Sequence, residues 1–479
     1  MTKTGSEVQI NSYTASVQAN PVVTGLANGG YVVSWQSVSQ DGSDFGVFLK
    51  VYDKYGKSST NEIQVNQYTA GVQAVPEVTS LANGGFVVSW VSDTQPPDSD
   101  SWGVFARQFD KTGKALTNEF LVNTTTVAGQ YEPSVTGTPD GGYLIAWRSD
   151  PGVDIYKQKF DAEGNKVGGE LQVNETTAGN QTNPSVASLS NGSSVVTWQS
   201  TQLGSSDTFL KVYNKNGDVI KNESIVNDVT VGDQVNPAVS GLSNGNFVVT
   251  WTSNQDGDDN IYYRIYDSAG NPISSSKMAN QYATGTQNMP SVTSLAGGGF
   301  VLSWSSEGQD GNGYAVVGRQ FDSNGIPDGD EFIMNTETNN DQSASRASGL
   351  TDGGFIGVWH SRWQDGSDWG IFGQRYKATY SVNTQEKAQD YLDKIGKASV
   401  SISGTRANLG ATQNRLENTI CNLQIQAENL QDSESRISDV DVADEMTNYV
   451  KQQILVQSAV AMLTQANSLS KLALDIIKQ

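Results

Sequence analysis

The chain has very little cysteine or histidine: its 479 residues contain one of each, Cys421 and His360. A single cysteine cannot form an internal disulfide. His360 has no serine or cysteine nucleophile beside it in a recognisable motif, so an enzyme is not predicted. No apolar run approaches the 18 or so residues of a transmembrane helix. The first residues, Met1–Glu7, contain no apolar stretch, so no classical secretion signal is predicted.

Positive charge is also scarce. Lys and Arg number 30 against 51 Asp and Glu, which gives a formal net charge of −21 and a pI near 4.4. Most of that excess, −18, lies before residue 381. An acidic surface repels phosphate backbones and anionic lipids, so neither nucleic-acid binding nor membrane insertion is expected.

The segment from Ser381 to Gln479 lacks proline and tryptophan entirely. All 12 prolines, all 10 tryptophans and 46 of the 49 glycines lie before it. A change of composition this abrupt predicts two architectures in one chain. We therefore expect a turn-rich β domain over residues 1–380 and a helical domain over residues 381–479.

One pattern recurs seven times between Glu7 and Ala378, in copies of about 53 residues. Each copy holds four short β-type segments separated by turns such as Asn-Gly-Gly and Asp-x-x-Gly, the latter at residues 53–56 and 110–113. Four strands in about 50 residues, repeated, predict the blades of a β-propeller. A tryptophan and a glutamine mark every copy. The tryptophans are Trp35, Trp90, Trp147, Trp198, Trp251, Trp304 and Trp359, and the glutamines are Gln18, Gln73, Gln130, Gln181, Gln234, Gln287 and Gln342.

The ends of the repeat region predict how the ring closes. The seventh copy has residues 353–359 (GGFIGVW) but no fourth strand of the form Glu-x-x-x-Asn. The chain begins with such a strand, residues 7–11 (EVQIN). We expect this strand to complete blade seven, which removes the open strand edges of an array. The predicted fold class is mainly β with an α arm: a seven-bladed β-propeller followed by long C-terminal coiled-coil-type helices.

The repeated tryptophans are predicted to pack between blades, and the glutamines to hold the scaffold by hydrogen bonds. The loop after each tryptophan is the best candidate for chemistry in the propeller, because aspartates flank a glycine in several copies. Carboxylate and carbonyl oxygens ligate Ca²⁺, so weak calcium sites are one interpretation. The other is acidic β-turns on a solvated face, since the spacing is not that of an EF-hand. The candidate ligands are Asp41, Asp44, Asp256, Asp258, Asp365 and Asp368.

The helical domain carries apolar residues at heptad spacing between Leu409 and Ile437. Such spacing predicts a long helix with one face that needs a partner helix. A second helix is expected to begin near Asp441 and to continue to the chain end, or the two helices could fold on the propeller as a hairpin. The candidate assembly residues are Leu409, Gln413, Arg415, Leu416, Ile420, Leu423, Leu430, Ile437, Ile454, Leu469, Leu472 and Ile476.

The same segment resembles the C-terminal region of bacterial flagellin. The matching runs are residues 409–420 (LGATQNRLENTI), 435–445 (SRISDVDVADE), 453–455 (QIL) and 463–469 (LTQANSL). The propeller repeats, in turn, look like those of large secreted bacterial proteins. The flagellin resemblance implies a filament subunit whose helices polymerise, with the propeller in place of the outward-facing domain. It also implies an extracellular location on the bacterial flagellum.

The flagellin resemblance implies partners as well: other flagellin subunits, a chain that supplies N-terminal flagellin helices, and a flagellar export chaperone. Only six residues precede the first expected strand, so a helical N-terminal half is not expected within this chain. The alternative is an extracellular binding or adhesion propeller, recognising a glycan or depending on Ca²⁺, with the helices as an anchor. No cofactor is expected apart from weakly bound Ca²⁺.

Overall fold

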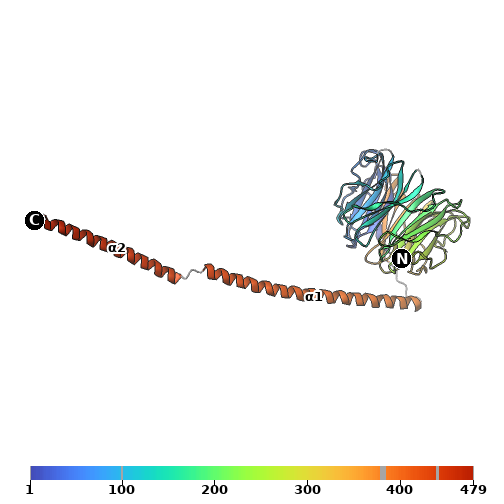
Figure 1. Cartoon of the computed structure of the whole chain (residues 1–479). Coiled ribbons are helices and arrows are strands. Elements are labelled where there is room, and N and C mark those ends of the chain that lie inside the picture. The colour runs from blue at the N-terminus through green and yellow to red at the C-terminus, as the bar shows by residue number, and fades with distance from the viewer. Residues whose placement is uncertain (1, 99–100, 151, 378–384, 439–441, 478–479) are drawn as a thin grey trace. The chain divides into compact units, whose positions relative to one another are not determined.

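The computed structural model describes residues 2–98, 101–150, 152–377, 385–438 and 442–477 (Figure 1). Only the backbone is described at 385–391, 393–394, 397–398, 401, 437–438 and 472–477. The chain divides into two compact units, Met1–Tyr380 and Ser381–Gln479. The first is built of strands and the second of helices, so the predicted fold class is confirmed.

In the described residues, 28 strands form seven four-stranded antiparallel sheets, the blades of the propeller. Blades 1 and 2 contain β2 (Gln18–Gly25), β3 (Tyr31–Val38), β4 (Phe45–Tyr52), β5 (Ile63–Gln64), β6 (Gln73–Ser80), β7 (Phe86–Asp93), β8 (Trp102–Phe109) and β9 (Phe120–Leu121). Blades 3 and 4 contain β10 (Gln130–Gly137), β11 (Tyr143–Ser149), β12 (Asp154–Phe160), β13 (Lys166–Gln172), β14 (Gln181–Ser188), β15 (Ser194–Ser200), β16 (Asp207–Tyr213) and β17 (Val219–Ile225).

Blades 5 and 6 contain β18 (Gln234–Gly241), β19 (Phe247–Ser253), β20 (Asn260–Tyr266), β21 (Lys277–Met278), β22 (Gln287–Ser294), β23 (Phe300–Glu307), β24 (Tyr314–Phe321) and β25 (Phe332–Ile333). Blade 7 contains β26 (Gln342–Gly349), β27 (Phe355–Arg362), β28 (Trp369–Lys377) and β1 (Thr2–Gln9). Consecutive strands of a blade are neighbours, because short turns such as Asp53–Gly56 reverse the chain between them.

The N-terminal strand closes the ring as the sequence predicts. β1 pairs antiparallel with β28, with Thr2 opposite Lys377 and Gln9 opposite Phe372. Beyond β1, Asn11 Oδ1 accepts a hydrogen bond from Ile371 N at 2.7 Å. The same amide–backbone contact recurs in every blade, for example from Val47 N to Asn66 Oδ1 at 2.9 Å. Blade 7 is therefore built from both ends of the repeat region, and its asparagine makes the same hydrogen bond as the asparagines of the other six blades.

The core lies between neighbouring blades, where the repeated tryptophans are at most 1% exposed. Trp90 of blade 2, for example, belongs to one buried cluster with Val32, Val47 and Leu49 of blade 1. Aromatic rings on the third strand stack against several of these tryptophans, as Phe105 does on Trp90 at 6.5 Å between ring centroids. The predicted packing role of the tryptophans is confirmed.

Glutamates on the fourth strands, or immediately before them, join adjacent blades. Glu119 of blade 2 accepts hydrogen bonds from Gln67 N at 2.6 Å and Tyr68 N at 2.8 Å, in the connection that leaves blade 1. Glu7 on β1 does the same for blade 7 by accepting from Thr336 N at 2.6 Å. A carboxylate that receives backbone N–H donors makes a strong, charge-assisted link. The N-terminal strand thus holds blade 7 to blade 6 as well as completing it.

The helical unit contains two helices in its described residues, α1 (Gln385–Ser438) and α2 (Val442–Ile477) (Figure 1). α1 runs without interruption through Gly396, Gly404 and Gly410. The sequence predicts that the second helix begins near Asp441, and α2 begins one residue later, at Val442; residues 439–441 lie outside the described residues. Neither of the described helices is long and apolar enough to cross a membrane.

Candidate functional site

A narrow apolar seam runs along α1. Large aliphatic side chains recur at every seventh position, and each is more than half exposed in the single chain. The members described are Ile395, Ile402, Leu409, Leu416, Leu423 and Leu430. A strict seven-residue repeat keeps its members on one side of a helix that winds around a partner. The seam therefore begins two heptads earlier than the sequence prediction placed it.

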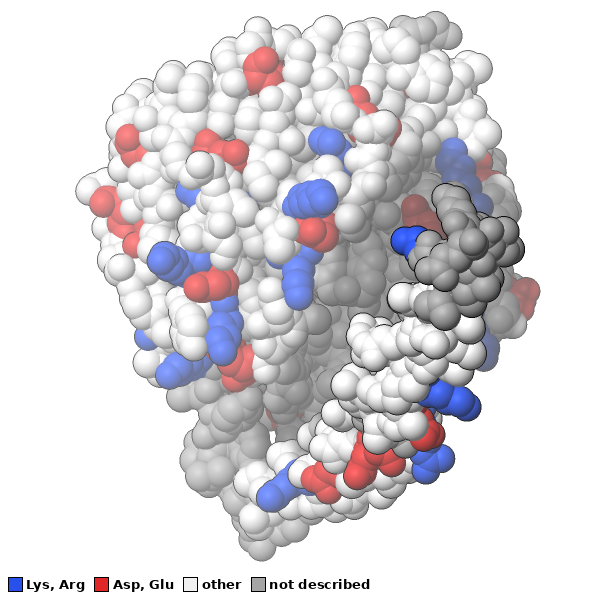
Figure 2. All heavy atoms as spheres, turned by 90° about the vertical axis from the view of Figure 1, so that its left-hand side faces the viewer, with Lys and Arg blue, Asp and Glu red and all other residues white. Residues whose placement is uncertain are grey.

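α2 differs from α1, because its large apolar residues lie on all sides. At 100° per residue, Val442, Val450, Leu455 and Leu463 point in four well-separated directions, and all four are exposed in the single chain. Between Lys451 and Lys471 the helix carries no charged residue. Figure 2 shows acidic and basic side chains interspersed on the propeller face in view, and a stretch of uncharged atoms beside charged side chains on the helical unit. A helix that is apolar all round is normally enclosed by protein.

The structure describes most of the predicted assembly residues. Leu409, Leu416, Ile420, Leu423, Leu430, Ile454 and Leu469 are between 54% and 70% exposed. Gln413 and Arg415 are exposed too, and Gln413 donates to Glu417 at 3.0 Å along the same helix. The side chains of Ile437, Leu472 and Ile476 lie outside the described residues. Their role in assembly stays a prediction.

The acidic loops of the propeller hold the scaffold. Asp41 Oδ2 accepts a hydrogen bond from Asn66 Nδ2 at 3.0 Å, and Asn66 Nδ2 also donates to Gln73 Oε1 at 3.1 Å. Asp365 takes the same place in blade 7, where its Oδ2 accepts from Asn11 Nδ2 at 3.0 Å. These contacts join the loop after the tryptophan to the connection between blades. They also confirm the scaffold role of the glutamines.

The remaining candidate ligands occupy other positions. Asp44, Asp256 and Asp258 are exposed, and Asp256 accepts a hydrogen bond from the Tyr262 hydroxyl. Asp368 accepts from Arg362 Nε at 3.1 Å. In the part of the chain that the structure describes, no group of three or more His, Cys, Asp and Glu side chains could hold a metal ion.

Weak calcium binding stays a prediction, and calorimetry tests it. If the loops bind Ca²⁺, titration of the chain releases or absorbs heat that is lost in the Asp41→Ala and Asp365→Ala variants. Both variants also remove a hydrogen bond between an asparagine amide and a charged carboxylate, so each is expected to lower the free energy of unfolding by about 1–3 kcal/mol. A titration of the unaltered chain with no heat above that of buffer would reject the calcium sites.

The central channel is lined by the first strand of every blade and has a volume of about 470 Å³. Glu77, Arg346 and His360 face it. Burial raises the pKa of Glu77, and burial lowers the pKa of His360 to about 4. His360 lies against Trp369, at 4.4 Å between ring centroids, and its Nε2 is 2.7 Å from Ser343 Oγ. These contacts give His360 a packing role.

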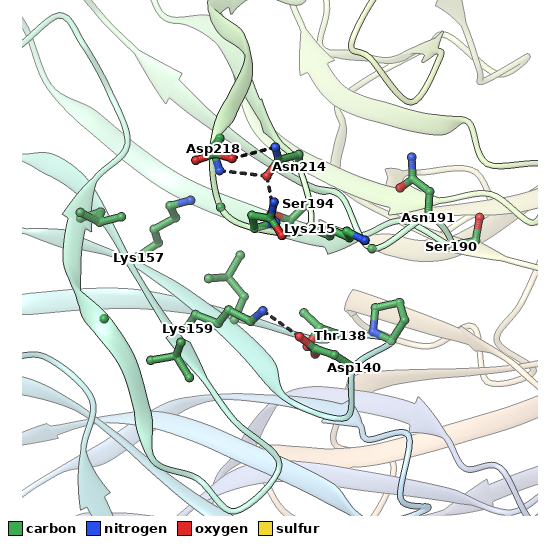
Figure 3. A pocket seen from close by; sticks show the side chains of 18 of the residues that line it. Thr138, Asp140, Lys157, Lys159, Ser190, Asn191, Ser194, Asn214, Lys215 and Asp218 are labelled. Carbon is green, nitrogen blue, oxygen red and sulfur yellow. Dashed lines mark hydrogen bonds and ion pairs between the residues drawn. The ribbon is translucent and has the colours of Figure 1, made fainter.

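A larger cleft, of about 990 Å³, lies between blades 3 and 4 (Figure 3). Blade 3 contributes two lysines, Lys157 and Lys159, and blade 4 contributes the turn Asn214–Asp218. Lys159 Nζ pairs with Asp140 Oδ2 at 2.7 Å. Sequence reasoning missed this cleft.

Lys157 is 5% exposed, and its ammonium group lies over the ring of Tyr213. Within the described part of the chain it donates no hydrogen bond and forms no ion pair, whereas nearby Lys211 pairs with Glu175 at 2.9 Å. Burial, and next the positive charge of Lys211, lower the pKa of Lys157 to about 7. A buried cation without an anionic partner destabilises the folded state.

Replacing Lys157 by Met is expected to increase the free energy of unfolding at pH 7 by roughly 2–4 kcal/mol, because it removes that uncompensated charge. The effect should depend on pH. Below about pH 7 the Lys157 amine is protonated in the folded and in the unfolded chain, so it lowers the free energy of unfolding by a constant amount. Between about pH 7 and pH 10 the folded state loses this proton before the unfolded state does, so the stability of the unaltered chain rises with pH. Urea unfolding of both proteins across this range measures the effect, and parallel stability curves would contradict it.

Comparisons with known proteins identify the helical unit. Residues 392–476 match the model of the bacterial flagellin C-terminal helical region. Flagellin FlaB2 of Treponema pallidum (strain Nichols) is 44% identical over 102 residues, which are 21% of this chain and 36% of that protein. A flagellin of Clostridium tyrobutyricum is 51% identical over 86 residues, 18% of this chain and 23% of that protein. The flagellin resemblance of the C-terminal region is confirmed, and the chain spans about a third or less of the length of these relatives.

The propeller is similar in fold to a protein of unknown function from Dyadobacter fermentans, with a TM-score of 0.50. The two are 12% identical, and the alignment covers 78% of this chain and 98% of that chain. An identity this low shows the fold alone.

Proposed function

We propose that this chain is a structural subunit of the bacterial flagellar filament, in which the C-terminal helices polymerise and the propeller is displayed on the outer surface. The observation that carries the proposal is the apolar seam of α1, which lies within the segment that matches flagellin. Each Leu or Ile that passes from water into a packed interface gains roughly 1.5–3 kcal/mol. Six such residues in register favour association along the helix.

The two helices are suited to different surroundings. α1 needs a partner along one side, because six of its large aliphatic residues recur at every seventh position. α2 has apolar residues in all directions, so a place enclosed by several neighbouring helices suits it best. Other flagellin subunits, or a chain that supplies N-terminal flagellin helices, would provide these neighbours. A flagellar export chaperone would cover the same residues before assembly, and the assembled protein would lie outside the cell.

Electron microscopy of the purified chain, alone and mixed with full-length flagellin, tests the proposal. We expect the chain to sediment with the filaments, and the filaments to carry extra globular density outside their helical core. Filaments of unaltered appearance, with the chain left in the supernatant, would contradict it.

A second candidate is an extracellular binding propeller that uses its helices only as an anchor. The observation that favours it is the cleft between blades 3 and 4, a hollow lined with charged side chains on an otherwise regular ring. The two candidates differ in what α1 does. If the helices are only an anchor, a charged residue on the α1 seam leaves ligand binding by the propeller unchanged as long as the chain stays attached. If the chain is a filament subunit, the same charged residue prevents its assembly into the filament.

A further inference from the structure

Blade 3 breaks a rule that the other blades follow. In each blade, the repeated tryptophan on the second strand pairs with a residue on the third strand. The residue that follows this partner on the third strand faces the next blade along the chain. In blade 3 this residue is Lys157, because Trp147 pairs with Tyr156. The other six blades have an uncharged residue there: Leu49, Ala106, Leu210, Tyr263, Gly318 and Gly373.

The turn of blade 4 that lies nearest this position also differs from the corresponding turns of other blades. A Cβ added to Gly113, Gly270 or Gly325 would lie 2.7–2.8 Å from a side chain of the preceding blade, so these turns pack closely. The equivalent residue of blade 4, Gly217, has nothing within 4 Å of that point. On the blade 3 side, Gly168 and Gly169 also line the cleft, and as glycines they have no side chains to fill it. The cleft is therefore a local gap in a ring that is closely packed at the sibling positions.

The charges in the cleft define what fits it. Lys159 is neutralised by Asp140, and Asp218 accepts a hydrogen bond from Asn214 Nδ2 at 3.0 Å. Lys157 is left with one positive charge and no anionic partner among the described residues. Figure 3 shows the amines of Lys157 and Lys159 on one side of the hollow, with Ser190 and Asn191 at its other end. Hydroxyl and amide groups of this kind bind the hydroxyls of a ligand.

We propose that the cleft between blades 3 and 4 binds a small polyhydroxylated monocarboxylate, of the uronic acid class, with Lys157 as the counter-ion of the carboxylate. Lys157 is the buried ammonium of the lining that has no ionic partner among the described residues, and it matches one negative charge. Lys215 also lines the cleft but is exposed to water, so it offers a phosphate dianion only a weak second contact. A volume of about 990 Å³ holds a sugar of one or two rings. Binding supplies the missing charge partner, which is why a lysine occupies a position that is uncharged in the sibling blades.

Calorimetry of the full-length chain with sodium glucuronate tests this site, with glucose and inorganic phosphate as comparison ligands. We expect saturable binding of glucuronate, no binding of glucose, and weaker binding of phosphate. Lys157→Met should weaken glucuronate binding at least about tenfold, a loss of roughly 1.4 kcal/mol. Lys157→Arg retains the charge and should keep most of the affinity. Lys159→Met, a matched change at the paired lysine, should alter it less than about threefold.

A second measurement keeps the test independent of folding defects. Titration of the Lys157 side chain by NMR should show its pKa rising when glucuronate is added, because a bound carboxylate stabilises the charged amine. The site is ruled out by the absence of saturable glucuronate binding to the folded chain, by equal affinity of the Lys157→Met variant, or by tighter binding of phosphate. Filament assembly does not enter these measurements, so failure here leaves the proposed function standing.

Discussion

A chain with Leu416→Asp and Leu423→Asp is expected to lose co-assembly with flagellin filaments by 100-fold or more. The two leucines are consecutive members of the α1 seam, 58% and 57% exposed in the single chain. Losing the burial of two leucines removes roughly 3–6 kcal/mol, and placing carboxylates in an apolar interface adds a desolvation cost. Sedimentation with full-length flagellin, followed by quantification of the pellet, measures the loss.

Asn418→Asp is the matched control, because this residue lies two positions after Leu416 and hence on the opposite side of the helix. It adds one negative charge beside Leu416, against two in the seam variant, and leaves the seam residues unchanged. We expect its co-assembly to stay within about threefold of the unaltered chain, which corresponds to less than about 1 kcal/mol. If both variants lose assembly equally, the seam is not the interface. If neither does, the helices are an anchor or fold elsewhere.

Ile10→Asp is expected to lower the free energy of unfolding of the propeller by about 4 kcal/mol or more. Ile10 follows the N-terminal strand and is fully buried, in one cluster with Trp35, Val33 and Ile371. Its backbone N–H also donates to Ile371 O at 2.8 Å, inside the joint that closes the ring. A carboxylate at this point must either stay charged in an apolar core or expel the strand. Urea unfolding followed by tryptophan fluorescence measures the change.

Val8→Asp supplies the comparison within the same strand, since Val8 is 39% exposed. A loss under about 1 kcal/mol is expected there. Similar losses for both variants would mean that charge on β1, rather than the buried contact of Ile10, weakens the propeller. An unchanged Ile10→Asp variant would mean that the ring does not depend on its N-terminal strand.

The fold of the propeller could be predicted in detail because the sequence repeats the same pattern of about 53 residues seven times. A single tryptophan in an alternating segment predicts a strand, but Trp35 through Trp359 at nearly constant spacing predict seven equivalent sheets. The count of strands at the two ends predicted ring closure, and the pairing of β1 with β28 confirms it. The heptad spacing of α1 was equally readable, although its start at Ile395 was missed because polar residues such as Ser399 and Arg406 occupy the second line of the seam.

The sites of the propeller were less predictable, for two reasons. An aspartate beside a glycine suggests a metal ligand, but whether its oxygens are already occupied depends on partners such as Asn66 and Asn11, which lie far along the chain. Lys157 looks like an ordinary polar residue of an alternating strand. Its unusual position emerges only when the register of blade 3 is compared with Leu49 and Leu210 in the sibling blades. The repeated tryptophans alone do not align this position, because it lies 10 residues after Trp147 in blade 3 (157 − 147) and 16 residues after Trp90 in blade 2 (106 − 90).

The pairing of β1 with β28, which closes the ring, affects the order in which the propeller folds. Asn11 and Ile371 are 360 residues apart, yet their contact is part of the last sheet of the ring. During synthesis β1 is made before the other strands of the ring, and it has no partner until β28 has been made. Contacts between such distant residues form slowly, because a long loop must close before they are gained. The ring therefore closes only once β28 is available to pair with the N-terminal strand.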